Sequence, residues 1–288
     1  MAGWVVARKN GPLFSGVRNK ARREAIRRFV NENCPDQISK IDEITKKNDE
    51  YQDRFFSFSL AASLAVFFNR PNTLRRLAED IDVQGLEILD KYRDEGVIAF
   101  GYHIGPISVV PVMMTLLGYD TTFLLRPDTI KRDLGLTIEQ INARLKVFGR
   151  NDEIGEISGI DSFSSFSIVQ MKKRLRKGQI LFIYPDTVHT SSADCVAVPI
   201  FNSEIAGHLG VAKLYRMTSA KIVPIDFGWH DDGRQYFHVK PPLEIHDDLS
   251  DEQIVRRVYQ GMETRLRVDL AQWLRVRIFD LLKYQSGE

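Results

Sequence analysis

Residues 97–108 read VIAFGYHIGPIS, and this stretch carries the pattern that decides the fold. Its first four residues are apolar and predict a short buried strand, while Gly101 and Gly105 predict a turn after it. Pro106 is typical of a first helical turn, because the N–H that proline lacks would have no partner there. The stretch therefore predicts a strand, a turn and a helix, with His103 at the carboxyl end of the strand.

The same alternation extends along the chain on both sides of this stretch. Other apolar runs predict strands at residues 121–125, 180–184, 222–227 and 236–239. Around them, helical patterns occupy residues 85–92, 108–117, 138–148, 163–176 and 207–217. Strands that alternate with helices are typical of an α/β sheet with helices on its faces.

The chain is predicted to form one domain over residues 1–288, because no repeat or long linker divides it. Residues 1–80 are expected to form an N-terminal helical segment, residues 81–248 the α/β core, and residues 249–288 a C-terminal helical segment. A serine-rich patch at residues 158–167 predicts a loop and a helix cap.

The composition excludes several classes of protein. Lys and Arg number 40 against 38 Asp and Glu, so no net field draws the protein onto nucleic acid, and we expect no nucleic-acid partner. Two cysteines are too few for a disulfide scaffold and fit a reducing compartment. The apolar run at residues 55–68 is shorter than the ~20 residues of a membrane span, and no removable targeting segment is visible, so we expect a cytoplasmic protein.

Residues 18–30 predict a strongly basic helix with a single acidic residue, Glu24. Its basic residues are Arg18, Lys20, Arg22, Arg23, Arg27 and Arg28. Such a helix either lies on an anionic membrane surface or presents a solvated face to water. The first alternative predicts a protein peripheral at the inner face of the membrane.

Three polar residues follow apolar runs: His103, Asp186 and Arg126. Ligands of α/β sheets gather at the carboxyl ends of strands, which makes these residues candidates for a site. His103 is either catalytic or caps a turn. Asp186 orients His103, contacts a substrate or caps a turn. Arg126 either recognises a phosphate or carboxylate or pairs with Asp186 or Asp128.

Common catalytic motifs are absent from the sequence. We find no Walker A loop, no Gly-x-Gly-x-x-Gly after a strand, no Gly-x-Ser-x-Gly elbow and no His-Glu-x-x-His. The six histidines do not show zinc spacing, so no metal site is expected.

Several segments, in order, resemble one known family. They are VQGLEIL (83–89), GVIAFGYHIG (96–105), LRP (125–127), LRKGQ (175–179), YPD (184–186), AKIVPI (220–225), YFHVKPPL (236–243) and QW (272–273). Over roughly residues 57–278 the chain resembles the lysophospholipid acyltransferase superfamily, and within it the bacterial lipid A biosynthesis (lauroyl/myristoyl) acyltransferases. The resemblance implies a glycerol-3-phosphate acyltransferase-like fold: a central mixed, largely parallel sheet flanked by helices, with an N-terminal helical segment.

The resemblance also implies a reaction, the transfer of an acyl chain from a thioester of acyl carrier protein or CoA to a hydroxyl or amine of a lipid or small molecule. No cofactor is expected, because the thioester is a substrate. His103 matches the family's histidine, a general base in a His-x4-Asp/Glu motif. Backbone N–H groups near Gly105 are expected to hold the oxyanion, and Arg126 and Tyr184 to bind substrate.

The sequence departs from the family motif at one position. Ser108 stands where the motif has Asp or Glu, and a hydroxyl cannot supply the charge that orients a catalytic histidine. One alternative is that Asp186 takes over the orienting role beside Ser108. The others are a chain that binds an acyl group or carrier without transferring it, and a thioester hydrolase.

Overall fold

The structure is a computed structural model that describes residues 12–68, 70–107, 109–125, 157–161, 167–188 and 194–284. Seven strands of this part of the chain form one sheet in the order β1-β9-β8-β2-β5-β3-β4. They are β1 (Asp82–Gln84), β2 (Val97–Phe100), β3 (Thr121–Leu125), β4 (Ile157–Asp161), β5 (Ile180–Ile183), β8 (Lys221–Trp229) and β9 (Gln235–Val239).

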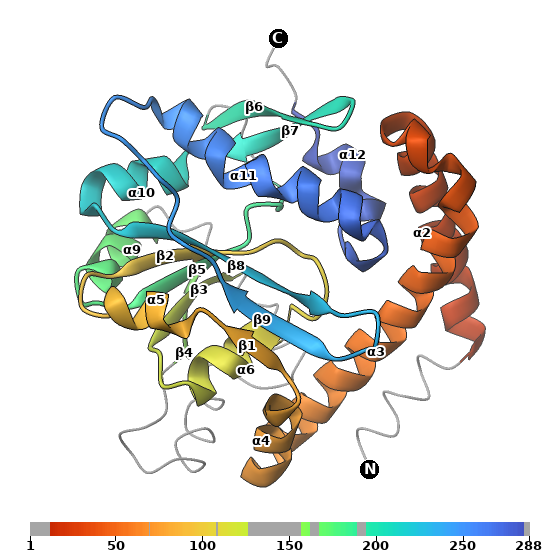
Figure 1. The fold of residues 1–288 in the computed structure, drawn as a ribbon, viewed down its shortest axis with the longest axis horizontal. Coiled ribbons are helices and arrows are strands. Elements are labelled where there is room, and N and C mark those ends of the chain that lie inside the picture. The colour runs from red at the N-terminus through yellow and green to blue at the C-terminus, as the bar shows by residue number, and fades with distance from the viewer. Residues whose placement is uncertain are drawn as a thin grey trace.

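The sheet is mixed and largely parallel, as expected. Strands β8, β2, β5, β3 and β4 run parallel to one another. Strand β9 returns antiparallel to β8 through a hairpin, and the short edge strand β1 pairs parallel to β9. The carboxyl ends of β2, β5 and β8 therefore lie at the same edge of the sheet, which is where the predicted site residues begin (Figure 1).

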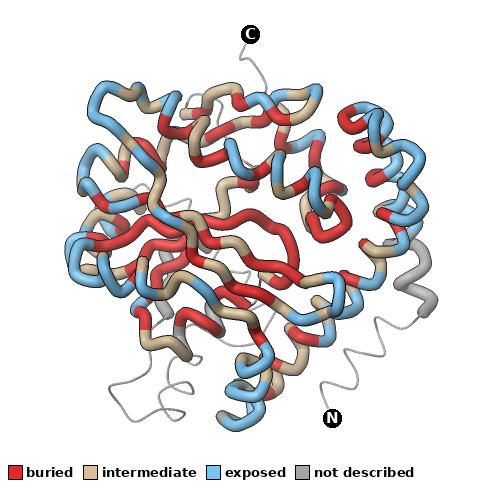
Figure 2. Tube along the Cα trace, in the orientation of Figure 1, coloured by how far each residue is buried: buried red, intermediate tan, exposed pale blue. Residues whose placement is uncertain are grey.

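Helices cover the two faces of this sheet and form a separate hydrophobic cluster on each (Figures 1 and 2). One cluster includes side chains from α2 (Pro12–Asn33), α9 (Ser167–Leu175), α10 (Gly210–Thr218) and α11 (Asp251–Val268). The other includes side chains from α3 (Ile41–Phe67), α5 (Leu86–Lys91) and α6 (Val109–Leu116). Strand β2 is buried along its whole length between the clusters, as its four apolar residues require.

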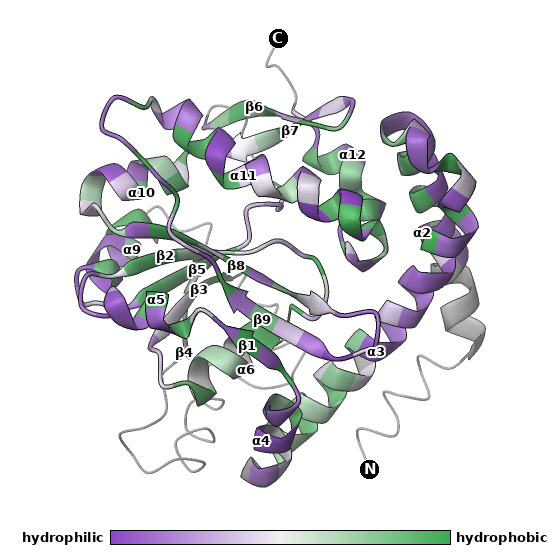
Figure 3. Ribbon diagram, viewed as in Figure 1, coloured by the Kyte–Doolittle hydropathy of each residue, from purple (hydrophilic) through white to green (hydrophobic). Residues whose placement is uncertain are grey.

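The N-terminal part is helical, with α2 followed by a 3-10 turn (Pro35–Lys40), then α3 and α4 (Pro71–Glu79). Hydrophilic and hydrophobic bands alternate along α2 (Figure 3). Its apolar side chains Ala25, Ile26, Phe29 and Val30 are buried. Several of its arginines pair with carboxylates: Arg23 with Asp49 at 2.5 Å, Arg27 with Asp42 at 3.1 Å and Arg28 with Asp280 at 2.8 Å. None of the described helices has the length and hydropathy that crossing a bilayer requires.

Three local expectations were wrong. Residues 158–161 belong to strand β4 and pair with β3, where we expected a loop. A two-stranded hairpin, β6 (Cys195–Ile200) with β7 (Ser203–His208), occupies a stretch where only a helix from residue 207 was expected. After α11 the chain does not stay helical but breaks into 3-10 turns (Leu270–Gln272 and Val276–Ile278) before the four-residue α12 (Phe279–Leu282). The predicted helix at 138–148 lies outside the described residues.

Candidate active site

His103 lies just past the end of β2, in a turn that the C-terminal turns of the chain hold in place. The backbone N–H of Leu274 donates to the carbonyl of His103 at 2.8 Å, and Ile104 forms an isolated bridge with Trp273. Gly105 adopts φ +72°, the left-handed region, and an added Cβ there would lie 2.6 Å from the Cα of Gly228. The sharp turn that follows His103 therefore requires glycine at this position.

Asp186 lies beside His103 because β2 and β5 are parallel neighbours in the sheet, and both strands end at the same edge. Asp186 Oδ1 lies 2.9 Å from His103 Nδ1, and both carboxylate oxygens accept from the backbone N–H of His103, at 3.1 and 2.9 Å. Trp273 Nε1 donates to Oδ2 at 3.1 Å. The carboxylate is only 1% exposed, and these three donors offset the cost of burying its charge.

The hydrogen bonds around the imidazole fix its tautomer. A guanidinium can only donate, so the Arg275 Nη2 atom, 2.7 Å from His103 Nε2, donates to the lone pair on that nitrogen. The ring proton is then on Nδ1, where it is donated to Asp186. With the ring proton on Nδ1, the lone pair of Nε2 points away from the carboxylate, which is the arrangement that a general base needs.

Tyr184 lies against the imidazole, with its ring centroid 4.5 Å from that of His103. Its hydroxyl donates to the carbonyl of Ile107 at 3.1 Å. Burial, together with the charge of Asp186, raises the pKa of Tyr184 well above its usual range, so this hydroxyl stays protonated. The ring supports the histidine, and its substrate-binding role stays a prediction.

The helix α11 braces both strand ends that carry the site. Tyr102 donates its hydroxyl to the carbonyl of Val258 at 2.5 Å, and Tyr259 donates to the carbonyl of Pro185 at 2.6 Å. On the other side, Phe29 of α2 packs edge-on against Trp273 at a centroid distance of 5.4 Å. The N-terminal helix thus supports the indole that binds Asp186.

The structure brings together His103, Asp186 and Tyr184 of the predicted site. It also places Gly105 in the turn, but the N–H of Gly105 donates to the carbonyl of Gln272 at 2.9 Å and so already has a partner other than an oxyanion. Ser108 and Arg126 lie outside the described residues.

Two residues of the site were not predicted as site residues, Trp273 and Arg275. For Trp273 the sequence offered one indication, the pair Gln272-Trp273, which matched the family but did not suggest a role. Arg275 lies two residues after this pair. Gln272 is buried and links the turn to β8: it accepts from the backbone N–H of Trp229 and donates to the carbonyl of the same residue, both at 2.9 Å. Arg275 lies 172 residues after His103 in the sequence, so only the tertiary fold brings it against the end of β2.

The family model described as bacterial lipid A biosynthesis acyltransferase matches residues 45–277. Among solved structures, the crystal structure of the 1-acyl-sn-glycerophosphate (LPA) acyltransferase PlsC from Thermotoga maritima is similar at 12% sequence identity. That match covers 88% of this chain and 97% of the other, with a TM-score of 0.41. No curated protein matches the chain.

Proposed function

The chain belongs to the bacterial lipid A biosynthesis acyltransferase family, and from that premise we propose that His103 is the general base of its acyl transfer. Membership makes the protein a lipid acyltransferase. The observation that supports the assignment of the base is the line of contacts Asp186–His103–Arg275, in which Asp186 accepts from Nδ1 and Arg275 donates to Nε2.

In the proposed reaction, Nε2 of His103 takes the proton from the hydroxyl of the acceptor lipid as its oxygen attacks the thioester carbonyl. The tetrahedral intermediate collapses with cleavage of the C–S bond, and the thiolate leaves with the proton that Nε2 had taken. The products are the acylated lipid and the free thiol of the carrier. The donor is an acyl thioester of acyl carrier protein or CoA, a substrate, so the reaction needs no cofactor.

Asp186 supplies the negative charge that the family motif would place at Ser108. It accepts from Nδ1 and so stabilises the imidazolium that forms during proton transfer. Its further bonds to the backbone of His103 and to Trp273 prevent the carboxylate from turning away. This geometry supports a change of partner within the site, from the motif position to the YPD segment.

Arg275 restricts access to the base. Its guanidinium donates to the same lone pair that must accept the proton of the acceptor, so it has to give way before transfer. A hydroxyl of the incoming acceptor displaces it. The displaced cation then lies beside the carbonyl that is attacked, where a positive charge stabilises the oxyanion.

The capped lone pair and Ser108 together favour one second candidate, a protein that binds an acyl group or carrier without transferring it. In that case Arg275 stays on Nε2 and the thioester remains intact after binding. A hydrolase differs from both, because it consumes thioester and releases free fatty acid.

The experiment is to incubate the protein with radiolabelled acyl-CoA or acyl carrier protein thioesters, with and without a panel of lipid acceptors, and to identify products by mass spectrometry. Labelled acylated lipid that appears only when acceptor is present supports transfer. Free fatty acid whatever the acceptor supports hydrolysis, and saturable binding with intact thioester supports the binding protein. Either of the last two results overturns the proposal.

The proposed location is the cytoplasm, with contact to an anionic membrane through the basic side chains of α2. Lys20 is exposed, whereas Arg23, Arg27 and Arg28 have carboxylate partners that reduce the positive field. Reaching a lipid acceptor requires such a contact, and its expected strength is modest.

A further inference from the structure

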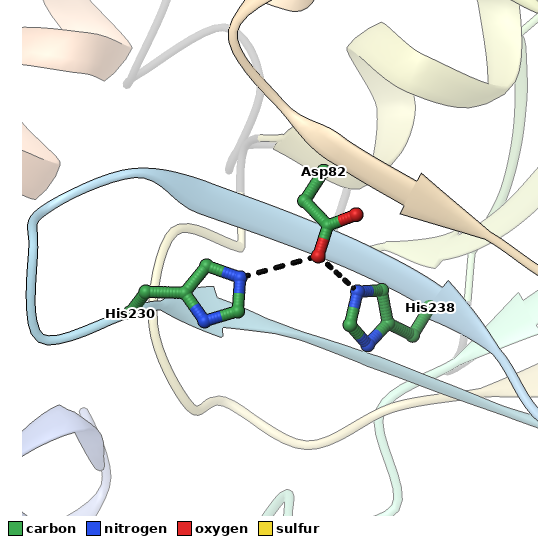
Figure 4. Close-up of side chains that lie close together, drawn as sticks. All are labelled: Asp82, His230 and His238. Atoms are coloured by element: carbon green, nitrogen blue, oxygen red, sulfur yellow. Dashed lines mark hydrogen bonds and ion pairs between the residues drawn. The ribbon is translucent and has the colours of Figure 1, made fainter.

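A cluster of three side chains with metal-ligating atoms lies where the edge strand β1 meets the β8–β9 hairpin, and none of the three side chains takes part in the catalytic proposal. Asp82 comes from β1, His238 from β9, and His230 from the turn directly after β8. Figure 4 shows both imidazoles pointing toward one oxygen of the Asp82 carboxylate. The Nε2 atom of His238 lies 2.9 Å from Asp82 Oδ2, and that of His230 lies 3.3 Å from the same oxygen.

We propose that Asp82, His230 and His238 bind a divalent transition-metal ion of the zinc type. Around a tetrahedral zinc with bonds of about 2.0–2.1 Å, neighbouring ligand atoms lie about 3.3 Å apart. The two separations from Asp82 Oδ2 are within a few tenths of an ångström of that value, and all three ligand atoms lie within 4.8 Å of one another. Small side-chain rotations therefore suffice to complete the site.

The donor set favours this class of ion over Mg²⁺ or Ca²⁺. Imidazole nitrogen suits Zn²⁺ and its neighbours, while the hard alkaline-earth ions take oxygen ligands. The side chains are partly exposed, 36% for His230 and 29% for Asp82, so water can reach the fourth position. The nearby cation Arg234 is paired with Asp232 at 2.7 Å, which limits its repulsion of an ion.

The backbone holds the ligands before any ion arrives. The turn after β8 is closed by bonds from the N–H of His230 to the carbonyl of Arg234 at 2.8 Å and from Gly233 back to His230 at 2.9 Å. His238 lies within the β8–β9 ladder, and Asp82 starts the register of β1 with β9. An ion would join the three-residue edge strand to the hairpin. Spacing along the chain did not indicate this site, because Asp82 lies 148 residues before His230.

The alternative is a purely structural role in which Asp82 accepts hydrogen bonds from two imidazoles. Asp82→Asn separates the two possibilities, because an amide oxygen still accepts hydrogen bonds but is a much poorer ligand for Zn²⁺. His230→Ala removes the most exposed ligand and is the variant least expected to disturb folding. His246→Ala is the matched control, since His246 is an exposed histidine in a loop outside the cluster.

The test is isothermal titration of ZnCl₂ into the full chain without an affinity tag, together with thermal melts of each variant with and without Zn²⁺. We expect one Zn²⁺ per chain, unaffected by excess Mg²⁺, and a melting temperature about 5 °C higher at a Zn²⁺ concentration of about 100 times Kd. Asp82→Asn and His230→Ala should each weaken binding at least tenfold and lose the thermal shift, while His246→Ala keeps both. No saturable Zn²⁺ binding, or binding that survives Asp82→Asn and His230→Ala unchanged, would overturn the proposal.

Discussion

Asp186→Asn tests the hydrogen bonds around the base with a change of a single group. The carboxylate accepts from three donors: His103 Nδ1–H, the backbone N–H of His103 and Trp273 Nε1–H. An amide has one accepting oxygen and one donating nitrogen. If its nitrogen faces His103, Nδ1 must accept and the ring proton moves to Nε2, where it opposes the guanidinium of Arg275. If its oxygen faces the ring, the amide nitrogen meets the N–H of Trp273.

Both orientations of the amide should lower kcat and the free energy of unfolding. The wrong tautomer and the lost charge reduce kcat by about 10⁴-fold, equivalent to about 5 kcal/mol of transition-state stabilisation. A buried donor without an acceptor lowers the free energy of unfolding by about 1–3 kcal/mol. The predicted variant is thus folded, somewhat less stable and nearly inactive.

The assay is single-turnover transfer of a labelled acyl chain, with urea unfolding measured on the same samples. Asp248→Asn, an exposed aspartate in a loop, is the matched control and should keep wild-type rates and stability. A rate for Asp186→Asn within threefold of wild type would refute the orienting role of the carboxylate.

Three further outcomes follow from the structure. Arg275→Met frees the imidazole lone pair but also removes the cation proposed to stabilise the oxyanion. It should therefore lower KM for the acceptor about 3- to 10-fold, part of the ~1.5–3 kcal/mol of a charge-assisted hydrogen bond, and lower kcat at the same time. Steady-state kinetics showing a raised KM would instead make Arg275 a ligand of the acceptor, and an unchanged kcat would exclude its role at the oxyanion. Gly105→Ala brings a Cβ within 2.6 Å of the Gly228 backbone and should lower the free energy of unfolding by about 2–3 kcal/mol in urea melts. Gly233→Ala, which shares the positive φ but meets only the flexible side chain of Arg54, should have the smaller effect, and equal losses would contradict the packing argument. Co-sedimentation with vesicles should require anionic lipid and weaken as salt rises, so binding that ignores lipid charge would exclude the proposed role of α2.

The sequence predicted the elements whose residues carry a local signal. The four apolar residues of β2 and the glycines around His103 determine a strand and a turn by themselves, and the structure has both. The sheet class followed from alternation and from the resemblance. By contrast, Ile157–Asp161 has a serine and a glycine in a short run, so its pairing with β3 could not be told from a loop.

The site was predictable only in part, because its contacts join distant segments. The proximity of Asp186 to His103 depends on β2 and β5 being neighbours, which no spacing along the chain encodes. Arg275 and Trp273 reach the site because the helical pattern ends after Val268 and the chain turns back over the strand ends. A continuous helix over residues 249–282, as the sequence predicted, would not place these two side chains at the ends of β2 and β5.

The most direct test of the central claim is the rate of acyl transfer by His103→Ala, measured beside wild type with thioester donor and lipid acceptor at saturation. Removing the base should lower kcat by about 10²–10⁴-fold. A melting curve with a cooperative transition would establish that the variant is folded. A folded His103→Ala protein that transfers acyl groups as fast as wild type would contradict the assignment of His103 as the base.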